Sequence, residues 1–142
     1  MFIDDRLEFA DATEKLDTGI TDVIDLGATN TTRDIGSGKP MFLVIQVDTA
    51  VTRAAGACTV TFSLESDSTA NLATSATTHA ATGAIAKATL VAGYQTILAV
   101  PPGEYERYLG VRLTFSAAAD TGKFNIFLTD NPDTNRAYAD AL

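Results

Sequence analysis

The sequence contains few of the residues that build catalytic or metal sites. Its 142 residues include one cysteine (Cys58), one histidine (His79) and no tryptophan. A single cysteine excludes an internal disulfide framework and any metal site made from several cysteines. Zinc and copper sites need more nitrogen and sulfur ligands than these two residues supply. We therefore expect neither a metal nor a cofactor.

Long apolar runs are absent as well. No segment approaches the ~18 residues that a membrane-spanning helix requires. The first residues, Met1–Asp5, lack the basic start and the apolar stretch of a secretion signal. The length and the balance of 46% hydrophobic to 20% charged residues are typical of one globular domain. The sequence thus predicts a soluble single domain made in a reducing compartment, without a membrane partner.

Basic residues are scarce, since ten Lys and Arg stand against eighteen Asp and Glu, for a net charge of −8. The excess of acids lies in residues 1–25 and 130–142, and residues 26–129 are neutral overall. Nucleic-acid binding needs clustered bases, and an anionic membrane surface would repel this chain, so we expect neither as a partner. A protein partner with a basic or mixed surface fits the charge better. The alternative is that the acids only keep the chain soluble.

Apolar residues alternate with polar ones at a period of two, which indicates half-buried strands. The pattern is clearest in 58–65, 109–116 and 124–129, and 41–47 is apolar throughout, as in a strand covered on both faces. Weaker strand candidates are 20–26, 85–91 and 94–100. Seven or more short strands with Gly and Pro turn signals between them predict an all-β fold, a jelly-roll-like sandwich or barrel.

We expect this β core to span residues 19–129, with an N-terminal arm over 1–18 and a C-terminal tail over 130–142. Both ends carry apolar residues, which must fold back onto the domain or dock on another chain. Residues 66–84 form a long tract of Ala, Thr and Ser. A loop of that length is functional, mobile or conceals a short strand.

The candidate catalytic groups are isolated. We interpret His79 as an exposed loop histidine and Cys58 as a buried, inert thiol on the inward face of a strand. Glu104 and Glu106 would lie about 6–7 Å apart on an extended segment, a spacing that glycoside hydrolysis could use. The segment Glu104–Tyr108 is more typical of a structural turn and, after that, of a protein interface, which is rich in Tyr and Arg. We therefore predict no catalytic residue.

Segments spread over the whole chain resemble one known family. They are Met1–Asp4 with Leu7–Phe9, Val23–Gly27, Leu43–Asp48, Phe62–Asp67, Leu90–Gln95, Val100–Leu109 and Asn135–Ala141. Together they resemble the capsid cement (decoration) proteins of short-tailed bacteriophages. The Pro-Pro-Gly segment at 101–103 and the tail are the most specific parts.

The resemblance implies a structural virion protein without catalytic activity. Such proteins have a jelly-roll-like β fold, sit on the outer face of an icosahedral head and clamp neighbouring copies of the major capsid protein. They are commonly small symmetric oligomers. The expected location is therefore the outer face of the capsid, after synthesis in the cytoplasm of the bacterial host.

We expect the two ends of the chain to make the contacts with the partner. The expected apolar anchors are Phe2, Ile3, Leu7 and Phe9, and the expected orienting contacts are Arg6, Arg136 and Tyr138. Self-association is also expected because edge strands must be covered, with a twofold homodimer as the default and a trimer as the alternative. Two rival hypotheses are a sugar-binding jelly-roll module for host recognition and a hydrolase that uses Glu104 and Glu106.

Overall fold

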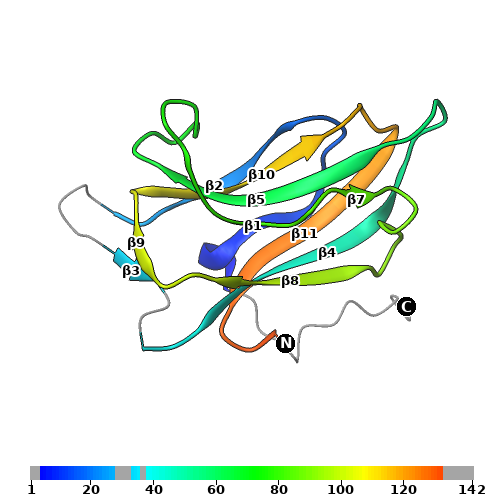
Figure 1. Cartoon of the computed structure of the whole chain (residues 1–142). Coiled ribbons are helices and arrows are strands. Elements are labelled where there is room, and N and C mark those ends of the chain that lie inside the picture. Colours follow the sequence, from blue (N-terminus) through cyan, green and yellow to red (C-terminus); the bar gives the residue numbers. More distant parts are fainter. Residues whose placement is uncertain (1–3, 28–32, 36–37, 133–142) are drawn as a thin grey trace.

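The computed structural model describes residues 4–27, 33–35 and 38–132, which form two antiparallel β-sheets packed face to face (Figure 1). Sheet A has the strand order β1 (Glu8–Glu14), β11 (Thr121–Thr129), β4 (Met41–Thr52) and β8 (Gln95–Val100). Sheet B has the order β2 (Gly19–Asp25), β10 (Tyr108–Phe115), β5 (Thr59–Asp67) and β6 (Thr77–Ala81). The short strand β7 (Ile85–Ala86) also pairs with β5, and β3 (Arg33–Ile35) pairs with β9 (Gly103–Tyr105). One 3-10 turn, η1 (Asp5–Leu7), precedes β1.

The chain passes repeatedly from one sheet to the other. Along the eight main strands, every connection crosses between the sheets except the one from β5 to β6. Eight main strands in two four-stranded sheets with these connections are the arrangement of a jelly roll. The all-β sandwich expected from the sequence is confirmed. No helix of the described residues is long and apolar enough to cross a membrane.

The alternating sequence patterns explain the core between the sheets. On β10 the apolar residues Leu109, Val111 and Leu113 are fully buried, as the pattern predicts. Phe62 of sheet B meets Phe124 of sheet A edge to face, with ring centroids 5.4 Å apart. Burying each such ring contributes about 1.5–3 kcal/mol to folding, so this pair is a main contact between the layers.

The segment predicted to be covered on both faces, 41–47, lies in the long strand β4 at the centre of sheet A. Its residues Leu43 and Ile45 belong to the core, while Val44 pairs with Phe127 of β11 and both are buried. The strand runs on to Thr52, beyond the predicted segment. The prediction of a strand over 85–91 is wrong beyond Ala86, because backbone bonds from Thr89 and Leu90 back to Ala86 close a turn there.

The Ala/Thr/Ser tract contains the concealed strand β6 and, before it, a loop over residues 68–76. Asp67, which is fully buried, organises this loop: its carboxylate accepts the backbone N–H groups of Thr69, Thr74 and Ser75 at 3.0–3.3 Å. Burial would raise the pKa of Asp67, but these bonds and the Ser68 hydroxyl lower it below its ordinary value. The loop is therefore an ordered part of the fold.

Candidate functional site

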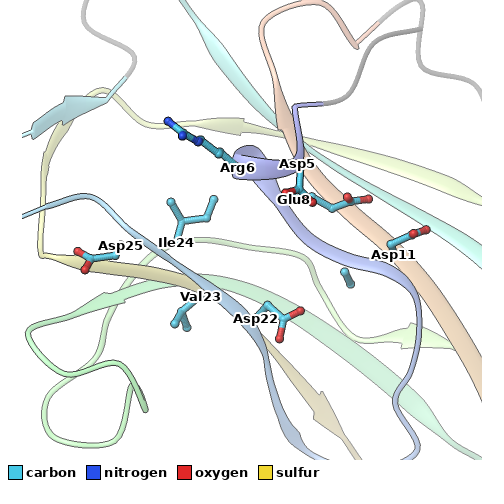
Figure 2. Close-up of a pocket in the computed structure, with 9 residues that line it drawn as sticks. Asp5, Arg6, Glu8, Asp11, Asp22, Val23, Ile24 and Asp25 are labelled. Carbon is cyan, nitrogen blue, oxygen red and sulfur yellow. The ribbon is translucent and has the colours of Figure 1, made fainter.

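A groove of about 660 Å³ lies at one open side of the sandwich (Figure 2). It lies between the segment Asp5–Asp11 and strand β2, the edge strand of sheet B that faces β1. Five carboxylic acids line it with one arginine and three apolar residues: Asp5, Glu8, Asp11, Asp22, Asp25, Arg6, Ala10, Val23 and Ile24. We call this feature the acidic groove.

Local features of the sequence shape one wall of the groove. Asp4 caps the turn η1 by accepting the backbone N–H of Arg6 at 3.0 Å. Strand β1 then pairs with β11 in a register that shifts twice, between Glu8 and Ala10 and between Ala10 and Thr13. Irregularities of this kind bend an edge strand and re-aim its side chains. The bent strand holds its acids along the rim rather than in a flat ladder.

The groove concentrates negative charge. The pKa of Glu8 is raised, first by its partial burial and then by the neighbouring charges of Asp11 and Asp5. On the opposite wall Asp25 forms an ion pair with Arg107 at 2.8 Å, and that guanidinium also lies 4.9 Å from the centre of the Tyr108 ring. A group that binds here would relieve the repulsion among carboxylates if it carried positive charge.

The acids of the groove do not form a metal centre. Within the described ranges, no three His, Cys, Asp or Glu side chains are close enough to hold a metal ion. The lining also contains the apolar residues Val23 and Ile24, of which Ile24 packs in part against the core. Lys and Arg match this chemistry, because their methylene stems cover apolar surface while their charged heads meet carboxylates. The groove is thus suited to a basic protein surface.

The comparison with known families matches the model of one family, Bbp16, over residues 10–128 of this chain. The chain belongs to the Bbp16 family. No curated protein matches the sequence. The match covers the sandwich from β1 to β11 and includes the β2 wall of the groove, whereas Asp5, Arg6 and Glu8 precede it.

This Bbp16-family chain places the predicted anchors differently from our expectation. Phe9 is fully buried in the core, and Leu7 is half-buried and packs against the same core. The prediction that Phe9 anchors a partner is therefore wrong for this fold, because its side chain stabilises its own domain. Leu7 keeps part of its surface exposed, and its role as an anchor stays a prediction. Arg6 is exposed and lies on the acidic groove, where a partner can reach it. The other four predicted contacts, Phe2, Ile3, Arg136 and Tyr138, lie outside the described residues.

The predicted arm over residues 1–18 also needs correction. Residues 8–14 form β1, which is hydrogen-bonded to β11 as a full member of sheet A. The β core of this family member thus begins at Glu8, eleven residues earlier than predicted. The alternation in Glu8–Ala10 is too short and too acidic to reveal a strand by itself. The structure describes the predicted C-terminal tail only as far as Pro132. Asp130, the first residue of this tail, forms an ion pair with Lys39.

The prediction that His79 is an exposed loop histidine is wrong. His79 lies in β6, is half-buried, and its Nε2 atom is 2.7 Å from Ser66 Oγ. Its ring stacks on Tyr105 with centroids 4.0 Å apart, and burial lowers its pKa while the charge of Glu106 acts in the opposite direction. Ser66 is completely buried and also accepts the backbone N–H of Glu106 at 3.2 Å. This pair therefore joins strands rather than presenting a nucleophile to a substrate.

Of the remaining candidates, Cys58 and Glu106 have structural partners. Cys58 is buried, as predicted. Glu104 is exposed on β9, and the Glu106 carboxylate accepts the Thr77 hydroxyl at 3.2 Å. Neither glutamate lines the acidic groove. Between them, the Tyr105 hydroxyl donates to the carbonyl of Pro101 at 2.5 Å, which fixes the Pro-Pro-Gly segment against β9.

Proposed function

We propose that this protein is a structural component of a bacteriophage virion that binds the outer surface of the head and cements neighbouring major capsid protein subunits. Its partners in this role are the major capsid protein and further copies of itself. The proposal starts from the resemblance of the sequence to capsid cement proteins. The jelly-roll sandwich is compatible with that role, although folds of this kind also serve many other functions.

The acidic groove is the observation that carries the proposal. It brings five acids from two separate segments to one open side of the sandwich, together with the exposed Arg6. A surface with an excess of one sign of charge steers a partner of opposite charge and sets the register of docking. A groove that serves only solubility would not need apolar residues between the acids.

Cementing requires added interface area rather than chemistry. A standard protein interface buries about 1,600 Å² in total, and a shell repeats the same contact many times. Each copy that bridges two capsid subunits therefore opposes the internal pressure that pushes them apart. An acidic protein is also better placed outside the shell than against packaged DNA, because like charges repel.

Binding to heads tests the proposal directly. Purified protein added to empty, expanded heads that lack it should bind to saturation and raise the temperature at which the heads disrupt. Asp11→Asn with Asp22→Asn, which removes two exposed groove charges, should weaken binding at least tenfold. Asp48→Asn with Glu104→Gln is the matched control, since it removes two exposed acids away from the groove and should bind like the unaltered chain.

The outcome also separates the rival functions. If the protein binds no heads but binds a glycan specifically, the sugar-binding hypothesis replaces the proposal. If a hydrolysed substrate is found and Glu104→Gln with Glu106→Gln abolishes its turnover, the hydrolase hypothesis replaces it. If heads bind both double variants equally well, the cement role stands but the acidic groove is not the contact surface.

A further inference from the structure

The two sheets have four main edge strands, and one of them differs from the rest. The edges are β1 and β8 in sheet A and β2 and β6 in sheet B, and β7 lies beside β5 on the same side as β6 but is only two residues long. An edge strand presents unpaired N–H and C=O groups, and proteins protect such edges with charges, proline or irregular pairing. A strand without these protections is suited to pair with another chain.

Three of the edges are protected. β1 carries Glu8, Asp11 and Glu14 and has two register shifts against β11. β2 carries two aspartates, and its register shifts against β10. β6 has no acid, but its pairing with β5 is broken at Leu64 and Glu65.

Strand β8 has none of these protections. Its residues, Gln95–Val100, include no charge and no proline, and they pair with β4 without a register shift from Gln95↔Gln46 to Val100↔Met41. Within the described residues, β8 pairs with β4 alone. Ile97 is 41% exposed, and Val91, in the turn that leads into β8, is 52% exposed. These are the exposed large apolar side chains of the described part.

We infer that β8 is the edge through which two copies of this chain associate, by antiparallel β8–β8 pairing across a twofold axis. The charge of the chain favours the pairing of a second copy at this edge. Two chains that each carry a net charge of −8 repel each other wherever their acids meet. The uncharged β8 edge is the one where a second copy adds regular backbone hydrogen bonds and covers Ile97 without placing carboxylates together.

The pairing would join two four-stranded sheets into one continuous sheet. A twofold contact uses the same patch on both copies and closes at a dimer. In Figure 1, β8 and the pair β1–β2 lie at different edges of the sandwich, so both surfaces can be used together. The inference deepens the self-association within the proposed function and leaves the acidic groove free for the capsid.

Sedimentation of the full chain tests the inference without heads. The chain should show a concentration-dependent mass that approaches twice 14.9 kDa. Ile97→Lys places like charges at the contact and should raise the dissociation constant at least tenfold. Thr78→Lys, at an exposed position on the β6 edge, is the matched control and should leave the dimer unchanged.

A second measurement remains informative if Ile97→Lys fails to fold. A spin label on Ile97→Cys should report a distance below about 25 Å between copies, given strand spacings of about 4.8 Å and a rise of about 3.4 Å per residue. The same label on Thr78→Cys should report a longer distance or none. Cys58 is buried and does not compete for the label.

A monomer at all concentrations, a trimer, or a dimer in which only the label at position 78 gives short distances would overturn the inference. Failure here is distinct from failure of the proposed function. A monomer that still saturates heads would refute β8 pairing alone. A β8-paired dimer that binds no heads would refute the cement role alone.

Discussion

The contacts of His79 show how one residue can join separate strands. Its ring on β6 stacks on Tyr105 of β9 and lies 2.7 Å from Ser66 of β5. Ser66 Oγ already accepts the Glu106 N–H, so its own proton is available for a neutral imidazole. Because a hydroxyl oxygen has two lone pairs, it can also accept from a protonated ring. Burial of the ring is therefore what favours the neutral form of His79.

Because this is the only histidine of the chain, its titration can be followed without overlap. Its pKa should lie below 6.5 in the folded protein, mainly because burial penalises the charged ring. Glu106→Gln should lower the pKa further, since the Glu106 charge acts to raise it. An NMR titration of the ring proton gives both values. A pKa at or above 6.5, or a rise in Glu106→Gln, would contradict the contacts described.

The same shift has a consequence for stability. A histidine with a lowered folded pKa is protonated more readily when unfolded, so the free energy of unfolding falls as the pH drops below 6.5. The free energy of unfolding stops falling for this reason once the pH is below the pKa of His79 in the folded protein. His79→Gln should lack this contribution while keeping the losses due to carboxylates at lower pH.

At the scale of elements, one residue holds the loop over 68–76 on the outer face of sheet B. This residue, Leu72, has a strained backbone conformation. Leu72 has a φ of 48° and yet is buried. Its side chain occupies the space above Gly110, where an added Cβ would lie 2.7 Å from Leu72 Cδ1 and 2.9 Å from Val23 Cγ1. Arg112 fastens the loop by donating to the Leu72 carbonyl at 2.6 Å and to Glu65 at 2.8 Å.

Gly110→Ala should therefore destabilise the fold by about 1–3 kcal/mol through overpacking. The cost should fall in a Leu72→Ala background, with a coupling of about 0.5–3 kcal/mol between the two sites. Gly83→Ala is the control, because nothing lies within 4 Å of its added Cβ, and it should change stability by less than about 0.5 kcal/mol. Urea unfolding measures all four variants. Additive effects of Gly110→Ala and Leu72→Ala would show that the loop does not pack there.

Strands with regular alternation could be predicted from the sequence, and the exceptions have physical reasons. Residues 109–116 alternate because one face meets the core, and 124–129 follow the same pattern except at Phe127, which is buried beside Val44. β6 is hidden because Thr77–Ala81 is an edge strand with small side chains and little burial. β1 is hidden because only Phe9 and Ala10 are buried among its acids.

At the scale of the molecule, the charge pattern predicted an acidic end but not the groove. The acids of residues 5–11 and 22–25 lie near one another only because β1 and β2 face each other across the two sheets. Local sequence does not encode that juxtaposition. Phe9 was mispredicted as an anchor for the same reason, since it reads as an exposed tail residue until β1 is placed in sheet A.

Amide hydrogen exchange on decorated heads tests the central claim most directly. The claim is that the acidic groove faces the capsid. Compared with the free protein, bound protein should exchange more slowly at the backbone amides of η1, β1 and β2, and equally fast in the loop over 68–76. Unchanged exchange at η1, β1 and β2 on saturated heads, with slowed exchange in that loop, would contradict the account.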